Sequence, residues 1–317
     1  MQKWCDTILD AVGKTPLVLL GRISPAGGAK IYAKVEGVNP GGSVKTRTAF
    51  AMIEAAERTG QLKPGAIIVE VTSGNQGIAM AMIGAVKGYA VRIVMPENMS
   101  VERQKLIRAY GAEIILTPAG ASITEAIEKA LAVADDMAAK DSRVFLPRQF
   151  ENVNNPDIHR RTTGQEILAQ MPGPVDAFVA GFGTGGTITG VGEVLKKAYP
   201  DVRIFAAEPK NAAILAGKPV GHHIQQGIGD GVIPPILNRD LIDDLVQVSD
   251  DEACETSRRL AREEGILCGV SSGTNACAAI KVAQKLGPGK SVVTVLPDTG
   301  ERYLSTGLFD CNKTTKK

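Results

Sequence analysis

The sequence predicts an α/β protein with two lobes, each built on a mainly parallel sheet flanked by helices. Short apolar runs alternate with helix-period segments between residues 66 and 146, and the alternation resumes at residue 175. Strands that alternate with helices are typical of parallel sheets. Polar, glycine-rich loops follow at least two expected strands, at the edge where open parallel sheets bind ligands. A chain of 317 residues is long enough for two domains.

In the first lobe we expect three pairs of a strand and a helix. Ser100 is placed to cap one of these helices, while Gly88 and Gly111 are placed to end two of them. The expected strands are 66–71, 91–95 and 113–116, and the expected helices are 77–87, 101–110 and 123–139.

In the second lobe the same alternation predicts three further strands and three helices. Ser249 and Glu252 have the spacing of a capping box, and the helix that they open is expected to end near Gly265. The expected strands are 175–180, 202–207 and 291–296; one helix runs to about Lys197, and the last helix covers about 274–286.

The composition excludes several function classes. Hydrophobic residues make up 44% of the chain and charged residues 22%, with a formal net charge of +2, so nothing favours nucleic-acid binding. The lysine-rich end, 313–317, is expected to be a solvated tail. No apolar run approaches the ~20 residues of a membrane helix, and the start M-Q-K-W-C-D lacks the apolar segment of a signal peptide. We therefore expect a cytoplasmic protein without a membrane partner.

Cysteine and histidine point to neither a disulfide framework nor a metal site. The number of cysteines is odd and no two form a C-x-x-C pair, so free thiols are expected. Three histidines are little material for a metal site or a histidine-based triad, and we expect no metal. The cysteines are Cys5, Cys254, Cys268, Cys277 and Cys311, and the histidines are His159, His222 and His223.

The stretch G-F-G-T-G-G-T-I-T-G, residues 181–190, contains the G-x-G-x-x-G pattern of a dinucleotide-binding loop. Glu208 follows Gly186 by 22 residues, which is close to the spacing of a ribose-binding acid. The stretch lies past the middle of the chain, however, and Thr184 and Thr187 can add hydroxyl hydrogen bonds to those of a helix N-terminus. A dinucleotide site, a cup for one phosphate and a plain glycine-rich turn all fit this stretch alone.

Lys45 favours the phosphate cup. It follows N-P-G-G-S-V and begins an expected helix, T-R-T-A-F-A-M-I-E-A-A. A helix N-terminus disfavours an ammonium and lowers its pKa, which is what a Schiff-base lysine needs. An isolated lysine in such a loop would be read as surface charge, but a lysine together with a separate phosphate cup is what pyridoxal phosphate requires.

Seven motifs in a fixed order resemble one enzyme family. These are V-G-K-T-P-L-V, N-P-G-G-S-V-K-T-R, T-S-G-N-x-G, G-F-G-T-G-G-T-I-T-G, G-I-G-x-G, G-V-S-S-G and G-E-R-Y-L-S-T. Together they resemble the cysteine synthase (O-acetylserine sulfhydrylase) family, within the tryptophan-synthase-β-like, fold type II enzymes that use pyridoxal 5′-phosphate. The resemblance spans about residues 8 to 309.

The resemblance implies a role for each motif. Lys45 would bind the cofactor covalently as an internal aldimine and then act as base and acid at the substrate Cα. Asn75 would hydrogen-bond the 3′ oxygen of the cofactor, and Ser271 would face its pyridine nitrogen. The phosphate would be held by Gly183, Thr184, Gly185, Gly186 and Thr187, and the amino-acid substrate by Thr72, Ser73, Gly74, Gln76, Gln149, Gly227 and Asp230.

The resemblance also implies a division into domains. A larger domain, 1–38 plus 153–317, would bind the cofactor phosphate, and a smaller mobile domain, 39–152, would bind the substrate, with the cofactor in the cleft between them. Two substrate positions depart from the usual pattern: Gln76 stands where the family has threonine, and Asp230 where an uncharged residue is common. A carboxylate there would favour cationic or neutral groups. Arg148 is a third candidate for an altered pocket.

The implied reaction is β-replacement, with L-cysteine made from O-acetyl-L-serine and sulfide through an aminoacrylate intermediate. A neutral Ser271 at the pyridine nitrogen makes a weaker electron sink than an aspartate would, which suits β-elimination. The alternatives are another donor (O-phosphoserine, serine or cysteine), another nucleophile (homocysteine, cyanide or an amine), a β-elimination lyase, and, less favoured, an NAD-dependent oxidoreductase. The family suggests a homodimer that can bind serine acetyltransferase.

Overall fold

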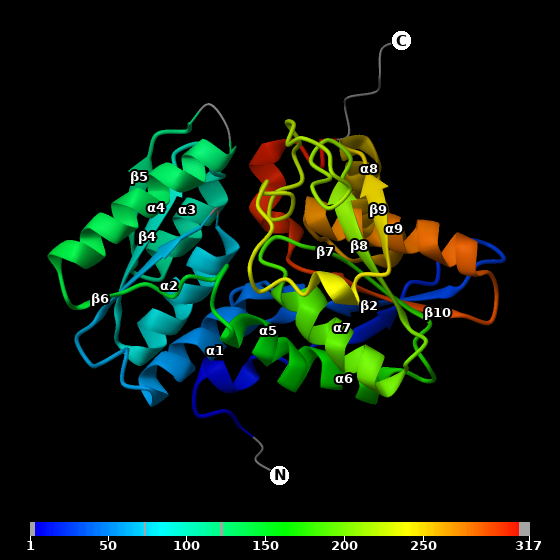
Figure 1. The fold of residues 1–317 in the computed structure, drawn as a ribbon, viewed down its shortest axis with the longest axis horizontal. Helices are drawn as coiled ribbons and strands as arrows, with labels where there is room; N and C mark the ends of the chain where they lie inside the picture. Colours follow the sequence, from blue (N-terminus) through cyan, green and yellow to red (C-terminus); the bar gives the residue numbers. More distant parts are fainter. Residues whose placement is uncertain (1–3, 73, 121–122, 311–317) are drawn as a thin grey trace.

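The computed structural model describes residues 4–72, 74–120 and 123–310. Its elements form two sheets with flanking helices, which stand side by side in Figure 1. We call the four-stranded sheet with the helices inside residues 75–140 the small lobe, and the six-stranded sheet with its helices the large lobe. The α/β class with mainly parallel sheets is therefore confirmed.

The small lobe is a parallel sheet in the order β5, β4, β3, β6. Alternate residues of its strands face opposite sides, because side chains alternate along a strand. Ile68 and Ile93 pack in one core with α2, whereas Ile67 and Val94 pack in a second core against α4. The bounds are β3 (Ile67–Val71), α2 (Asn75–Lys87), β4 (Ala90–Pro96), α3 (Val101–Ala109), β5 (Glu113–Thr117), α4 (Ile123–Lys140) and β6 (Val144–Phe145).

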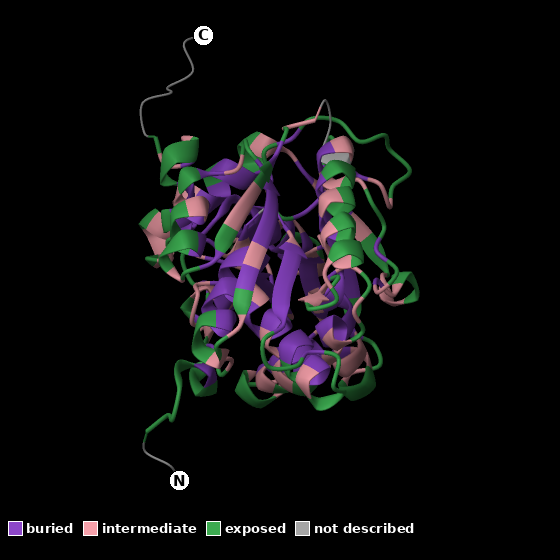
Figure 2. Cartoon of the chain, turned by 90° about the vertical axis from the view of Figure 1, so that its left-hand side faces the viewer, coloured by how far each residue is buried: buried purple, intermediate pink, exposed green. Residues whose placement is uncertain are grey.

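The large lobe is a sheet in the order β1, β2, β10, β7, β8, β9, in which only β1 is antiparallel to its neighbour. Its central strands, β7 and β10, are buried along almost their whole length. The purple strands that face the viewer in Figure 2 belong to the sheet of the small lobe, whose β3 and β4 are mostly buried as well. The strands are β1 (Leu17–Leu19), β2 (Lys30–Val35), β7 (Ala177–Gly181), β8 (Arg203–Pro209), β9 (Asp244–Val248) and β10 (Ser291–Leu296).

The helices of the large lobe cover the two faces of its sheet. Ala177 and Val179 pack in a core with residues of α8 and α9, while Phe178 and Ala180 pack in a core with residues of α7. These helices are α5 (Asn154–Ile158), a π-helical turn (His159–Thr163), α6 (Gly164–Gln170), α7 (Gly186–Ala198), α8 (Asp250–Glu264) and α9 (Val270–Leu286). The short 3₁₀ helices are Ile8–Ala11, Glu36–Val38, Arg239–Leu241 and Gly300–Thr306.

Helix α1 (Lys45–Arg58) connects the two lobes, and it begins at the lysine as the sequence predicts. The capping box at Ser249 and Glu252 and the left-handed Gly265 after α8 are confirmed as well. Two predictions differ from the structure. Ser100 stands at the N-cap of α3, but its hydroxyl donates to the Arg302 carbonyl instead of capping the helix. Helix α9 begins at Val270, so that the small polar residues predicted as a loop form its first turn.

The remaining expectations concern membrane spans, metal ligands and cysteines. In the part that the structure describes, no helix is both long and apolar enough to cross a membrane, and no group of histidine, cysteine or acidic residues could hold a metal ion. Cys5, Cys254, Cys268 and Cys277 are free thiols, of which all but Cys5 are buried. Cys311 and the lysine-rich tail lie outside the described residues.

Candidate functional site

A cavity of about 1220 Å³ lies between the two lobes and is called here the central cavity. The carboxyl ends of β3 and β7 and the first turns of α1, α2, α7 and α9 contribute to its wall. Loops that are far apart in the sequence therefore converge, as the sequence predicts. The predicted site residues that line it are Lys45, Thr72, Asn75, Gln76, Gln149, Gly183, Thr184, Gly185, Thr187, Gly227, Asp230 and Ser271.

Three predicted residues are not among the lining residues. Gly74 is the N-cap of α2 and Gly186 is the first residue of α7, so each adjoins residues that do line the cavity. Ser73 lies outside the described residues. The roles of all these residues stay predictions, since the cavity establishes only that they lie together.

Lys45 is the first residue of α1 and reaches the central cavity. Burial lowers the pKa of its amine, and the negative charges of Asp230 and Asp298 offset part of that effect. Among the residues that the structure describes, no carboxylate lies within ion-pair distance of the amine. A lysine with a lowered pKa is nucleophilic, because more of it is uncharged at neutral pH.

The loop between β7 and α7 forms a tight cup. Gly185 is the N-cap of α7 and has a φ of +81°, a conformation that disfavours any side chain. A Cβ on Gly183 would lie 2.3 Å from the carbonyl oxygen of Gly227, and one on Gly186 would lie 2.0 Å from Oδ1 of Asn155. Only glycines fit here, so backbone N–H groups at the helix N-terminus can approach an anion closely. The cup fits a single phosphate.

Two buried side chains that the sequence did not reveal support the cup. Asn155, in α5, donates from Nδ2 to Oγ1 of Thr184 at 3.0 Å and to the carbonyl of Gln149 at 2.9 Å. His159 is hydrogen-bonded through Nδ1 to Thr163 at 2.8 Å and through Nε2 to Thr187 at 3.3 Å. Burial lowers the pKa of His159 well below its usual value, and nearby positive charges add to this effect, so the ring is neutral.

The loop at the end of β3 is held from the large lobe. Asn75 donates from Nδ2 to Oδ2 of Asp298 at 2.7 Å and accepts from Arg302 at Oδ1, also at 2.7 Å. Both ends of its amide are therefore engaged by protein groups, while one Nδ2 hydrogen is left for a further acceptor, and the contact with a cofactor oxygen stays a prediction. Gln149 lies in the segment that leads from β6 of the small lobe back to the large lobe. It donates to the carbonyl of Val71 at 3.3 Å, which attaches this segment to the carboxyl end of β3.

Gln76 lies beneath this loop beside Glu70. The side chain is only 1% exposed, and neither atom of its amide makes a hydrogen bond of good geometry. Burial raises the pKa of Glu70 to about 8, while the Val71 N–H and the Gln76 amide act in the opposite direction. Gln76 is thus buried next to a carboxyl group that is largely protonated at neutral pH.

The remaining candidates differ in their surroundings. Asp230 lines the cavity, where burial raises its pKa and the charges of Lys45 and His223 counteract that rise. Arg148 is exposed and pairs with Asp135 at 2.8 Å; it does not line the cavity, so it is not part of an altered pocket. Glu208 is buried and accepts the backbone N–H of Leu215 at 2.8 Å, which is a structural role.

Arg103 is another lining residue that the sequence did not reveal. Its guanidinium lies over the ring of Tyr303, 4.7 Å from the centroid, and donates to Gln226 of the large lobe. A Cβ on Gly74 would lie 2.0 Å from its Cδ, so the arginine packs directly against the predicted substrate loop. No local signal in the sequence marks the contacts with Tyr303 and Gln226, because each joins residues more than a hundred positions apart.

The comparisons with known proteins agree with this geometry. Residues 8–298 match the model of the family described as pyridoxal-phosphate dependent enzyme. A cysteine synthase of Staphylococcus aureus is 51% identical over 309 residues, which are 97% of this chain and 98% of that protein. An O-ureido-L-serine synthase structure has a TM-score of 0.92 at 48% identity (98% and 97% covered), and a cysteine synthase of Entamoeba histolytica 0.91 at 39% (98% and 92%). The chain therefore belongs to the family of pyridoxal-phosphate-dependent enzymes.

Proposed function

We propose that the protein makes L-cysteine from O-acetyl-L-serine and sulfide by β-replacement. The observation that carries the proposal is the position of Lys45, with its lowered pKa, in the same cavity as a cup for one phosphate. Likeness to a cysteine synthase over nearly the whole chain supports the choice of reaction. Pyridoxal phosphate, when bound, supplies an electron sink for negative charge at the substrate Cα.

The residues of the cavity divide the remaining work. Lys45 binds the cofactor covalently and moves the proton at Cα. The cup, Gly183 to Thr187, would hold the phosphate through N–H groups and two hydroxyls, and Ser271 would be the neutral partner of the pyridine nitrogen. Because the serine is uncharged, it leaves the electron sink moderate, which suits loss of a leaving group from Cβ. Asn75 donates one Nδ2 hydrogen to Asp298, and its second Nδ2 hydrogen would bind the 3′ oxygen.

The proposed substrate contacts follow the same loops. The amino-acid carboxylate lies against backbone and side-chain donors at the start of α2, and Gln149 closes this site from the other side. In the division of domains that we propose, this loop belongs to the smaller, mobile domain, 39–152, and the cup belongs to the larger one, 1–38 plus 153–317. The proposed substrate residues are Thr72, Ser73, Gly74, Gln76, Gln149, Gly227 and Asp230.

A second candidate keeps the cofactor and changes the nucleophile or donor. Asp230 places a carboxylate on the cavity wall, which disfavours anionic groups, and O-ureido-L-serine synthase is a relative with 48% identity. A nucleophile that is neutral or cationic, such as an amine, is the form of this candidate that Asp230 favours. An NAD-dependent oxidoreductase, in contrast, leaves the buried Lys45 and the engaged Glu208 without a role.

A matrix of donors and nucleophiles tests the proposal. The holoenzyme is incubated with O-acetylserine, O-phosphoserine, serine or cysteine, each with sulfide, homocysteine, cyanide or an amine, and products are identified by mass spectrometry. Cysteine from O-acetylserine and sulfide should dominate, and Lys45→Ala should abolish it. Preference for another pair would select the second candidate, and undiminished turnover by Lys45→Ala would overturn both.

The assembly and location of the protein are also proposals. We propose a cytoplasmic homodimer that binds the C-terminal tail of serine acetyltransferase in the central cavity. The free thiols among the described cysteines are consistent with a reducing compartment. Light scattering should give twice the 33.3 kDa chain mass, and a synthetic acetyltransferase tail should inhibit competitively with the amino-acid donor; a monomer, or no inhibition, would refute the corresponding statement.

A further inference from the structure

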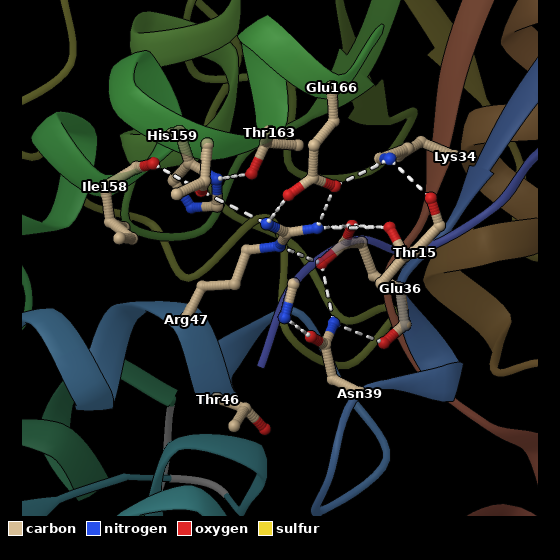
Figure 3. A network of polar contacts seen from close by, with 12 residues as sticks. Thr15, Lys34, Glu36, Asn39, Thr46, Arg47, Ile158, His159, Thr163 and Glu166 are labelled. Atoms are coloured by element: carbon tan, nitrogen blue, oxygen red, sulfur yellow. Dashed lines mark hydrogen bonds and ion pairs between the residues drawn. The ribbon is translucent and has the colours of Figure 1, made fainter. Parts of the chain in front are cut away.

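A buried network of ion pairs begins two residues after Lys45 (Figure 3). The Arg47 guanidinium donates from Nε and Nη2 to both oxygens of Glu36, at 2.7 and 2.9 Å. It donates from Nη1 and Nη2 to both oxygens of Glu166, each at 2.7 Å. The side chain of Arg47 is 1% exposed, and that of Glu36 is fully buried. Bidentate pairs of this kind fix orientation as well as distance.

The network balances its own charge. Lys34 pairs with Oε2 of Glu166 at 2.7 Å and donates to the carbonyl of Thr15 at 2.6 Å, while Asn39 donates to Glu36 at 2.7 Å. Two cations thus face two carboxylates. Although burial works against the charge on Arg47, its bonds to Glu166 and Glu36 raise its pKa, so the guanidinium stays charged at any ordinary pH.

The partners of Arg47 belong to the large lobe. Glu36 follows β2 directly, and Glu166 lies in α6. From Ala49 onward, in contrast, α1 packs with the small lobe, since Met52 and Ile53 share a core with Ile68 of β3. One helix is therefore attached to the large lobe at its first turn and to the small lobe along the rest of its length.

The neighbouring residue strengthens the attachment. The Thr48 hydroxyl donates to Oδ1 of Asn155 at 3.4 Å, and Asn155 in turn donates to Thr184 in the cup at 3.0 Å. The first turn of α1 is thus joined to the large lobe on two sides, through Arg47 to α6 and through Thr48 to α5, and the second of these paths continues to the phosphate cup.

We propose that Arg47 is a positioning residue, which holds the first turn of α1 on the large lobe and so keeps the Lys45 amine at a fixed place relative to the phosphate cup. The inference rests on the proposed role of Lys45 as the lysine that binds the cofactor. When the two lobes move relative to one another, Lys45 should therefore move with the phosphate cup of the large lobe, although the rest of α1 packs with the small lobe. A lysine at position 47 would keep the charge but lose the planar fork.

The test separates positioning from binding and from folding. Apoprotein is prepared from the holoenzyme of the wild type, Arg47→Lys and Arg259→Lys, the last a matched control because Arg259 forms only a surface pair with Glu263. The affinity for pyridoxamine 5′-phosphate measures binding at the phosphate cup alone, because this ligand has no aldehyde to react with lysine. The rate of covalent attachment of pyridoxal phosphate measures how well the Lys45 amine is positioned; the product is trapped with borohydride and located by mass spectrometry. A thermal melt measures whether the variant is folded.

Arg47→Lys should slow attachment by about tenfold to a hundredfold, as expected for a misplaced reactive group, with pyridoxamine-phosphate affinity within about threefold of wild type. Arg259→Lys should behave as wild type. Unchanged attachment in folded Arg47→Lys overturns the proposal, and so does an equal loss of attachment and pyridoxamine-phosphate affinity.

Two further variants keep the result interpretable. If Arg47→Lys does not fold, Glu166→Gln, which weakens one arm of the fork, should slow attachment in the same direction, and a wild-type rate there overturns the proposal. Lys45→Ala should lose attachment and retain affinity for pyridoxamine phosphate. Attachment at a residue other than 45 would refute the proposed role of Lys45, a failure distinct from that of Arg47.

Discussion

A hydrogen bond joins Asn75, which lines the central cavity, to Asp298, with Nδ2 of the asparagine 2.7 Å from Oδ2 of the carboxylate. The same oxygen accepts the hydroxyl of Tyr303, also at 2.7 Å. Asn75 opens α2 of the small lobe, whereas Asp298 follows β10 of the large lobe. The two lobes are therefore linked by a polar contact in the wall of the proposed active site.

The first prediction concerns the charge of Asp298. Asp298→Asn removes a negative charge that raises the pKa of Lys45, so burial of the amine should act with less opposition. Since the ammonium loses a favourable interaction, the amine should become neutral at lower pH. Labelling of Lys45 in the apoprotein by an amine-directed reagent, followed against pH, should show its midpoint moved to lower pH. Asp240→Asn, at an exposed site, is the control; a midpoint that does not move, or that rises, would contradict the prediction.

The second prediction is a pH dependence of stability caused by Glu70. Its pKa is about 8 in the folded protein against a reference of 4.5, so the folded state holds the proton more tightly. The resulting stabilisation is complete below about 4.5 and is lost as the pH rises through about 8, on the order of a few kcal/mol. Glu70→Gln cannot ionise, so its free energy of unfolding should fall less than that of wild type between pH 5 and 9.

Urea unfolding at several pH values measures this difference. Glu113→Gln is a matched control on the neighbouring part of the sheet, because Glu113 is an exposed carboxylate paired with Arg92. Parallel stability curves for Glu70→Gln and wild type between pH 5 and 9 would show that Glu70 does not titrate in this range.

The third prediction concerns Asn155. Asn155→Ala removes the donor to the carbonyl of Gln149 and one of the two donors to Oγ1 of Thr184, which still accepts the Gly186 N–H at 3.4 Å. An unsatisfied buried polar group costs about 1–3 kcal/mol, so unfolding in urea should begin at clearly lower concentrations. Affinity for pyridoxamine phosphate should fall too, because Thr184 belongs to the cup. Asn154→Ala, next in the chain but bonded only locally through its side chain to Asn152, should do neither; equal effects in both variants would argue against the role.

The fourth prediction uses two glycines of one helix. In Gly186→Ala the new Cβ would lie 2.0 Å from Oδ1 of Asn155, so the cup must open. In Gly192→Ala the nearest atom would be 3.7 Å away, an ordinary contact. Calorimetric titration with pyridoxamine phosphate should therefore show binding lost in the first variant and kept in the second. The second should also be more stable by about 0.5–1 kcal/mol, because alanine is the better helix former. Equal affinity in the two variants would refute the tight cup.

Patterns within a short stretch of sequence predicted much of the fold. The alternation of apolar runs located the strands from Ile67 to Thr117 and the helices between them within a few residues, because buried parallel strands leave a strong local signal. The start of α9 was placed about four residues too late, since the serines and glycine of 269–274 have weak helix propensity and are held by packing.

Contacts between distant parts of the chain could not be predicted in this way. Asn155, Arg103 and Asp298 each owe their place at the site to a partner in the other lobe or another loop. A single asparagine or arginine has no local pattern that distinguishes it from a surface residue. The resemblance of ordered motifs was enough to identify the residues that line the cavity. The residues that support them, such as Asn155 and Asp298, could be recognised only from the three-dimensional structure.

The strand order of the two sheets has a consequence for synthesis on the ribosome. All four strands of the small sheet come from one continuous segment, residues 67–145, whereas β10, residues 291–296, is inserted between β2 and β7. The small sheet can pair as soon as its segment has emerged. In the large sheet, one edge of β2 and one edge of β7 stay unpaired until β10 has been synthesised, near the end of the chain. Unpaired strand edges can pair incorrectly with other strands. Nascent chains that stall before β10 should therefore be the ones that chaperones retain.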